Sequence, residues 1–169
     1  VCGTRGRWFE STLLYQKMKK EKKNNPSKEL PLGFADRQEK ELLVRDFIIS
    51  NIKEVMTKYG FQYLETPSFE YSDSIGKFLP DKDRPDEGVF SFKDENNWLS
   101  LRYDLTAPLA RYVAKNYLEI PKPFKRYQLG TVWRNEKPGP GRFREFLQFD
   151  ADFVGTKSLQ SDAELCVMI

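Results

Sequence analysis

Three arginines surround a short loop rich in proline and glycine in the second half of the chain. Residues 133–148 read WRNEKPGPGRFREFLQ, with Arg134, Arg142 and Arg144 on either side of two prolines and two glycines. A plain surface hairpin does not need three guanidinium groups beside its turn. Guanidinium groups bind phosphate oxygens in pairs and stabilise the charge that develops in phosphoryl or adenylyl transfer. The pattern therefore predicts an anionic ligand at this loop.

The residues after the loop alternate in character, as the two faces of a β-strand do. One face is expected to point to the core, with Glu145 as its polar exception and with the apolar residues Phe143, Leu147, Phe149, Ala151 and Phe153. The other face is graded and carries Arg142, Arg144, Phe146, Gln148, Asp150 and Asp152. A ligand with an anionic middle, an aromatic base and a cationic end would match this order. Solvated charges on an exposed sheet face are the alternative.

The elements that must position these residues begin with a long helix. Apolar residues at spacings of three and four predict a helix from Asp36 to Tyr59, and Gly60 supplies its stop. The stretch FQYLETPSF is typical of a strand interrupted by Pro67, which belongs at an edge or an interface because proline lacks the amide donor. Residues 89–104 alternate on both sides of a turn at 94–97, so they predict a hairpin.

A second helix and two long strands follow the hairpin. Thr106 and Pro108 predict a helix over about 106–116, with Thr106 as its cap, because threonine caps well and proline is tolerated in the first turn. Strands are predicted over about 124–136 and 142–153. An antiparallel sheet flanked by helices is the expected architecture, and the fold class is α+β.

Composition excludes several classes of protein. The 169 residues are 39% hydrophobic, which suits one globular domain, and a net charge of +3 creates no overall field that would require nucleic acid. The chain has no histidine, which excludes Ser-His-Asp triads and most zinc sites. Cys2 and Cys166 lie far apart in sequence and indicate neither a disulfide framework nor a metal site, so a cytoplasmic setting is expected. No apolar run reaches membrane-spanning length.

Two segments look poorly ordered. Residues 1–30 include the basic stretch KMKKEKKNNPSKE, which we interpret as a solvated tail, with a contact to an RNA backbone as the alternative. The stretch FLPDKDRPDEG at 78–88 is typical of a mobile loop. The chain starts at Val1 and ends within an apolar helical pattern, so we expect it to be a fragment of a longer protein.

Three longer stretches resemble one family. FKRYQLGTVWRNEKPGPGRFREFLQFDADFVG resembles the second signature motif of class II aminoacyl-tRNA synthetases, in its histidyl-tRNA synthetase form. LRYDLTAPLARYVAKN resembles the histidine-binding segment of that family, and YGFQYLETPSFE is similar to the first signature motif, whose proline, here Pro67, lies in a dimer interface. The resemblance runs from about Gly33 to Ile169. It implies an incomplete class II catalytic core over 31–169, without the third motif and the anticodon-binding domain.

The resemblance implies an ATP site at the arginine loop. Arg134 would grip the α-phosphate and stabilise the attack by the amino-acid carboxylate. Glu136 would lie near the adenine and the Mg²⁺ ion, and Arg142 would face the nucleotide and the tRNA acceptor stem. Arg144 would contact the γ-phosphate, and Phe146 would lie under the adenine ring.

The resemblance also implies a histidine site. Asp104, Thr106 and Gln148 would receive the α-ammonium group, and Asp152 would face the imidazole. Each residue has a simpler reading, because Thr106 would also serve as a helix cap, Asp104 as a turn residue, Phe146 as core and Pro67 as an edge-strand proline.

The implied activity is that of a histidine–tRNA ligase. Such an enzyme activates L-histidine with ATP to histidyl-adenylate and transfers it to tRNA-His, as a cytoplasmic homodimer that uses Mg²⁺ and needs no membrane. The attacking group is already a carboxylate, so the absence of histidine side chains is no obstacle. This chain alone is expected to be inactive, because a second catalytic arginine and the third motif would lie further along the family's sequence.

Two other functions remain open at this stage. One is a non-catalytic paralogue that regulates histidine biosynthesis, but such a subunit would be expected to lose Arg134, Glu136, Arg144 and Gln148, which are all present. The other is an RNA-binding module, which would have no need for a histidine-binding set.

Overall fold

The computed structural model describes residues 28–75 and 88–168. The chain divides into two compact units, residues 1–31 and 32–169, and the helices and strands reported below all belong to the second unit. Most of the basic segment expected at 1–30 lies outside the described residues. The same is true of most of the charged loop expected at 78–88.

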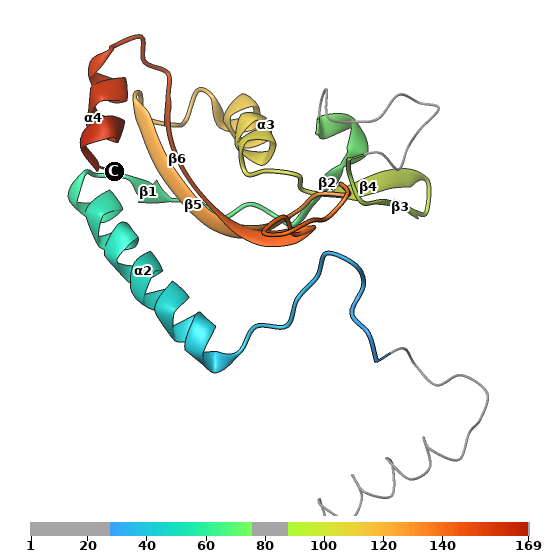
Figure 1. Ribbon diagram of the computed structural model, residues 1–169. Helices are drawn as coiled ribbons and strands as arrows, with labels where there is room; N and C mark the ends of the chain where they lie inside the picture. Colours follow the sequence, from blue (N-terminus) through green and yellow to red (C-terminus); the bar gives the residue numbers. More distant parts are fainter. Residues whose placement is uncertain (1–27, 76–87, 169) are drawn as a thin grey trace, which may run out of the picture. The chain divides into compact units, whose positions relative to one another are not determined.

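Two three-stranded sheets form the framework (Figure 1). The first has the order β1-β5-β6, in which β1 (Gln62–Tyr63) pairs in parallel with β5 (Phe124–Trp133) and β5 pairs antiparallel with β6 (Glu145–Val154). The second has the antiparallel order β2-β4-β3, in strands β2 (Phe69–Tyr71), β4 (Asn97–Leu101) and β3 (Ser91–Asp94). The α+β class is confirmed. The strands pair antiparallel as predicted, except for β1 and β5, which pair in parallel.

The first predicted helix is confirmed with a shorter start. Helix α2 covers Glu39–Lys58, and Gln38 before it has an extended backbone. Gly60 has a φ of +77°, a left-handed conformation that glycine adopts without strain, and it ends the helix as expected. The amide of Phe61 then bonds to the carbonyl of Met56 at 2.9 Å, so the chain turns directly into the first sheet.

The second predicted helix is confirmed, but its cap is not Thr106. Helix α3 covers Thr106–Asn116, and Leu105 occupies the N-cap position without a side-chain bond. The Asp104 carboxylate caps the helix instead, because its Oδ1 accepts the amides of Thr106 at 3.1 Å and Ala107 at 2.9 Å. Thr106 is already helical, which turns its hydroxyl away from that role. Two further helical elements are the 3-10 turn η1 (Ser72–Ser74) and α4 (Gln160–Met168).

The two long strands are shorter than predicted at the loop between them. Strand β5 ends at Trp133 and β6 begins at Glu145, so Arg142 and Arg144 belong to the loop and not to the strand. The backbone leaves the ladder because Asn135 pairs with Gly88 and Gly139 pairs with Arg142, and these bridges replace strand pairing. Strand parity therefore does not hold at 142–144. Phe143, predicted as core, is 44% exposed.

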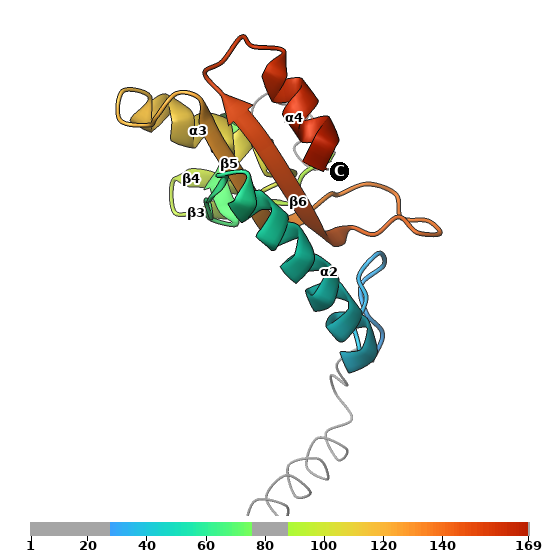
Figure 2. The ribbon, with the colours of Figure 1, turned by 90° about the vertical axis from the view of Figure 1, so that its left-hand side faces the viewer.

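The helices cover opposite faces of the β5–β6 hairpin (Figures 1 and 2). On the odd-numbered face of β6, residues from α2 and α4 pack around the buried cluster Met56, Phe61 and Tyr127, and this group includes Phe149, Ala151 and Phe153 as predicted. On the even-numbered face lie the start of α3 and the side chain of Arg102, which approach Gly130 of β5. The polar face predicted from parity is therefore the face that α3 covers.

Because Gly130 has no side chain, it leaves room for the guanidinium of Arg102, which hydrogen bonds hold in place. Arg102 is 5% exposed, and its Nε and Nη1 atoms donate to the carbonyls of Thr131 and Thr66, each at 2.8 Å. A Cβ atom on residue 130 would lie 2.5 Å from Nη2 of Arg102, which its own bonds hold in place. We expect Gly130→Ala to lower the free energy of unfolding by about 2 to 3 kcal/mol, because overpacking a fixed core costs that much.

Urea unfolding of the complete protein would measure this change. Gly139→Ala is the matched control, because a Cβ atom there meets nothing within 4 Å, and it should change the stability by less than about 0.5 kcal/mol. Equal stability of the two variants would show that Arg102 moves at little cost.

Candidate functional site

A pocket, called the arginine pocket below, lies where the arginine loop (residues 134–144) meets the start of β6. Its volume is about 300 Å³, and its lining consists of Arg134, Glu136, Gly141, Arg142, Phe143 and Phe146. Four of the five residues expected to bind ATP line this pocket, although they come from both ends of an eleven-residue loop and from a strand. The remaining one, Arg144, is not part of the lining. Its Nε donates to the carbonyl of Glu136 at 2.8 Å, so it supports the loop from behind.

Two aromatic rings hold the guanidinium of Arg134. Its central carbon lies 4.6 Å from the ring centre of Tyr103 and 4.9 Å from that of Phe146. Nε also donates to the carbonyl of Tyr103 at 3.4 Å, and the backbone amide of Arg134 donates to the carbonyl of Arg144 at 2.8 Å. Contacts with ring faces fix a guanidinium without consuming its N–H donors, which then remain suited to an anionic ligand.

Glu136 is held on both carboxylate oxygens. The hydroxyl of Tyr103 donates to one oxygen, and the guanidinium of Arg142 bonds to the other. The bond from Tyr103, followed by that from Arg142, lowers the pKa of Glu136 below its ordinary value, and the same contact raises the pKa of Tyr103. Glu136 is therefore a carboxylate at neutral pH. Within the described ranges, no group of three acidic, cysteine or histidine side chains could hold a metal ion by itself.

The residues expected to bind histidine gather around Asp150. Its Oδ1 accepts a bond from Nε2 of Gln148 at 2.8 Å, and its Oδ2 accepts one from the hydroxyl of Thr106 at 3.5 Å. The Oε1 atom of Gln148 is buried and has no hydrogen-bond partner among the residues that the structure describes. A buried acceptor of this kind costs free energy unless a ligand satisfies it.

Asp152 pairs with a fully buried arginine. Its Oδ2 atom lies 3.0 Å from Nη2 of Arg126, which is 0% exposed and also donates to the carbonyl of Leu105 at 2.9 Å. Burial raises the pKa of Asp152, and the carboxylates of Asp150 and Asp104 raise it further, whereas Arg126 opposes them. The carboxylates of Asp104, Asp150 and Asp152 thus face the buried guanidinium of Arg126. Together with Gln148 they form the carboxylate cluster. Their excess of negative charge suits a cationic ligand.

Sequence reasoning missed three members of these two clusters. The strand pattern puts Asp150 on the polar face with Gln148 and Asp152 but assigns it no role. Arg126 is directly opposite Asp152 in the β5–β6 register, which the pattern of a single strand does not reveal. Tyr103 had no signal of its own beyond its position next to Asp104. The cross-strand register would have found Arg126, since pairs opposite each other share a face.

Pro67 lies between β1 and β2, where the chain leaves one sheet for the other. Its carbonyl lies 3.5 Å from Nη1 of Arg102, so the guanidinium that packs against Gly130 also reaches this segment. None of these contacts tests its expected place in a dimer interface, which stays a prediction.

Comparison with known proteins decides the family. Residues 33–169 match the family described as histidyl-tRNA synthetase. The chain belongs to the histidyl-tRNA synthetase family. It is 61% identical over 140 residues to the histidine–tRNA ligase of Bartonella quintana (strain Toulouse), covering 82% of this chain and 28% of that one. It is 57% identical over 152 residues to the histidine–tRNA ligase of Rhodopseudomonas palustris (strain TIE-1), covering 88% and 30%.

Solved structures agree with this assignment. A histidyl-tRNA synthetase from Nostoc sp. PCC 7120 superposes with a TM-score of 0.70 at 30% identity, over 84% of this chain and 32% of that one. A protein from Bacillus halodurans C, described as an ATP phosphoribosyltransferase regulatory subunit/histidyl-tRNA synthetase, gives 0.72 at 25% identity, over 86% and 37%. The chain thus spans less than a third of the curated relatives quoted above. In the part that the structure describes, no helix is long and apolar enough to cross a bilayer.

Proposed function

We propose that the complete protein containing this chain is a histidine–tRNA ligase, which forms histidyl-adenylate from L-histidine and ATP and transfers the histidyl group to tRNA-His. The observation that carries the proposal is the order of the two clusters along one strand. Phe146 lines the arginine pocket, and Gln148, the next residue on the same face of β6, begins the carboxylate cluster. An anion site and a cation site that adjoin in this way fit a phosphate and an amino acid that must react with each other.

The chemistry needs positioning and charge stabilisation more than proton transfer. The histidine carboxylate attacks the α-phosphorus of ATP, a new P–O bond forms, and the bond to the β-phosphate oxygen breaks to release pyrophosphate. Arg134, held between two rings, neutralises the charge that builds up on the α-phosphate. Phe146 supports the adenine ring, and Arg142 contacts the outer part of the nucleotide. Arg144, whose Nε is bonded to the loop backbone, would need its remaining N–H donors to reach the γ-phosphate.

The carboxylate cluster orients the amino acid. The α-ammonium group takes Oε1 of Gln148 as one acceptor, since that atom is buried and lacks a partner among the described residues. Asp104 and Thr106 complete this contact, and Asp152 faces the imidazole. The carboxylate of the substrate then points toward the arginine pocket, because its ammonium end is held by the acidic cluster.

Glu136 fits a role as the protein's ligand to Mg²⁺. It is ionised, and Mg²⁺ is usually held by one or two carboxylates together with substrate phosphates and waters. A single carboxylate beside the phosphate site is therefore sufficient. When bound, the ion would neutralise charge on the phosphates of ATP.

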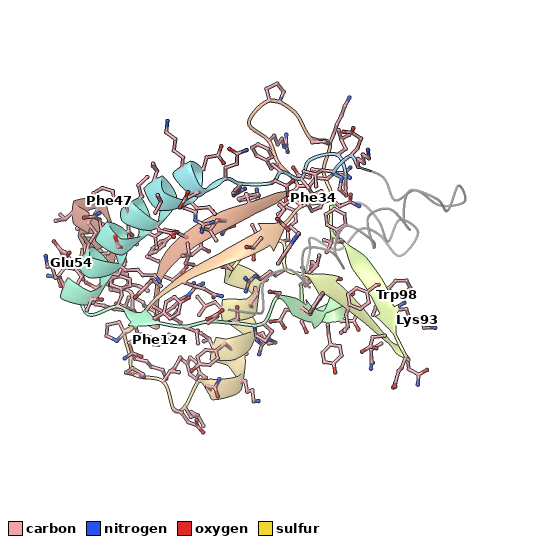
Figure 3. All side chains as sticks on the ribbon, turned by 90° about the horizontal axis from the view of Figure 1, so that it is seen from below. Phe34, Phe47, Glu54, Lys93, Trp98 and Phe124 are labelled. Atoms are coloured by element: carbon pink, nitrogen blue, oxygen red, sulfur yellow. The ribbon has the colours of Figure 1, made fainter. Side chains whose placement is uncertain are left out.

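Exposed apolar residues support assembly into a homodimer. On α2, Val44, Phe47 and Ile48 are 56%, 71% and 51% exposed, and Figure 3 labels Phe47 on this helix. An open groove of about 760 Å³ between α2 and the sheet is lined by apolar residues that include Ile52 and Leu147. Further segments of the complete protein or a second copy would cover this surface, with Pro67 in the interface. The cytoplasm is the proposed location.

Histidine-dependent ATP–pyrophosphate exchange by the complete gene product tests the proposal. We expect exchange with histidine and with no other amino acid. The 169-residue chain alone should show none, because it spans only 28% to 30% of the curated ligases. A folded complete protein without exchange would favour the non-catalytic regulatory subunit instead.

A further inference from the structure

Tyr103 lies between two residues that are each fixed to the fold. On one side, the Arg102 backbone accepts the amide of Trp133 at 3.1 Å and donates to the carbonyl of Ser68 at 3.0 Å, in addition to the clamp made by its side chain. On the other side, Asp104 caps α3 through two backbone amides. The backbone of Tyr103 therefore has little freedom, and its side chain is presented to the loop in one place.

From that position, Tyr103 contacts two charged residues of the arginine pocket, Arg134 and Glu136. Its ring lies 4.6 Å from the guanidinium carbon of Arg134, and its carbonyl accepts a bond from Nε of the same residue at 3.4 Å. Its hydroxyl donates to Glu136. Tyr103 thus contacts a cation and an anion of the loop that follows β5, the first through its ring and carbonyl and the second through its hydroxyl.

The other anchor of Glu136 is weaker. Arg142 pairs with the second oxygen of Glu136, but its side chain is 67% exposed. Ion pairs with such exposed partners contribute little and hold the geometry poorly. The fixed hydroxyl of Tyr103 is the contact that gives Glu136 a defined orientation.

We propose that Tyr103 is a positioning residue that ties the nucleotide pocket to the histidine-binding segment. It makes the orientation of Arg134 and Glu136 depend on the backbone at Asp104–Thr106. This inference rests on the proposed function for the identity of the two ligands. The role that it gives Tyr103 acts through Arg134 and Glu136.

Tyr103→Phe in the complete protein tests the hydroxyl and leaves the ring in place. We expect the KM for ATP in pyrophosphate exchange to rise about tenfold, because a hydrogen bond to a charged group is lost. The KM for histidine should change less than twofold. Tyr112→Phe is the control. This tyrosine belongs to α3 and stacks on Phe124, with 6.3 Å between the two ring centroids, away from the loop. An unchanged KM for ATP, or an equal rise for both substrates, would overturn the proposal.

A double-mutant cycle shows whether the hydroxyl acts through Glu136. In a Glu136→Ala background, Tyr103→Phe should raise the KM for ATP by less than twofold more, because the partner of the hydroxyl is already gone. Effects that multiply in full would place the role of the hydroxyl elsewhere and overturn the assignment. Tyr103→Leu, which also removes the ring from Arg134, should lower kcat in addition.

Direct binding separates this inference from the proposed function. Calorimetry with ATP and Mg²⁺ on the wild-type protein and on Tyr103→Phe needs no turnover. If the wild type binds ATP but shows no exchange, the ligase proposal fails, and an approximately tenfold weaker Kd of the variant still supports the role of Tyr103. If the two proteins bind ATP equally, the role of Tyr103 fails by itself. A wild type that binds no ATP refutes both.

Discussion

Arg134→Ala in the complete protein should lower histidine-dependent pyrophosphate exchange about a thousandfold, because removing one donor aimed at the charge of a transition state has effects of 10²- to 10³-fold. The loss should appear mainly in kcat, since the guanidinium is needed most when charge develops on the α-phosphate. Arg134→Lys should recover little of the rate, because an ammonium group lacks the planar fork and stacks less well between Tyr103 and Phe146.

The fold should survive this substitution. Arg134 belongs to a loop, and its removal leaves β5 and β6 paired, so circular dichroism and the sedimentation of the assembly should match those of the wild type. Lys58→Ala at the end of α2 is the control, because this exposed lysine pairs with Glu54 and lines neither the pocket of Arg134 nor the groove beside α2. Full exchange activity in Arg134→Ala would remove the assignment of this pocket to ATP.

Asp152→Asn should raise the KM for histidine about a hundredfold and make the protein more stable at neutral pH. A lost charge-assisted bond to the imidazole accounts for the first effect, at about 2 to 3 kcal/mol. The second effect follows from the pKa of Asp152, which burial and two neighbouring carboxylates raise in the folded state. Ionising this group costs more in the folded than in the unfolded protein.

The stability difference between Asp152→Asn and the wild type should depend on pH. A carboxyl group whose folded pKa is raised contributes stability that is fully present below its unfolded value of about 3.8 and is lost as the pH rises through the folded pKa. The stability advantage of Asp152→Asn should therefore appear at pH 7 and vanish toward pH 3. Urea titrations at both pH values measure it, and Asp94→Asn in the exposed hairpin turn provides the control. A variant less stable than the wild type at pH 7 would show that pairing with Arg126 outweighs burial.

Local patterns predicted the regular elements well and the loop poorly. Helix α3 has the predicted bounds, and Gly60 ends α2 as expected, because periodicity and left-handed glycines act within a few residues. The overrun of both strands into residues 134–136 and 142–144 has the opposite cause. Alternation continues through those residues, but pairing with Gly88, remote in sequence, removes the backbone from the ladder.

The site could be predicted where a motif was long and could not where contacts cross the fold. Four residues of the expected ATP set line one pocket, which agrees with the resemblance without testing ligand binding. Tyr103 and Arg126 matter through partners on other elements, Glu136 and Asp152. The reversal of roles at α3, where Asp104 caps and Thr106 does not, depended on the backbone angles of Leu105, which residue types alone do not specify.

The parallel pair β1–β5 has a consequence for the order in which the protein folds during synthesis. Gln62 pairs with Arg126, so the 64 residues that follow Gln62, up to Arg126, must also leave the ribosome before this edge of the sheet can form. Helix α2 and the β2-β4-β3 sheet need only earlier residues and are available first. Pairings between distant residues pay their loop entropy before they gain contacts, and they therefore form late. The apolar side of α2 should meet its sheet only after β6 is complete, and until then a nascent chain offers this surface to chaperones.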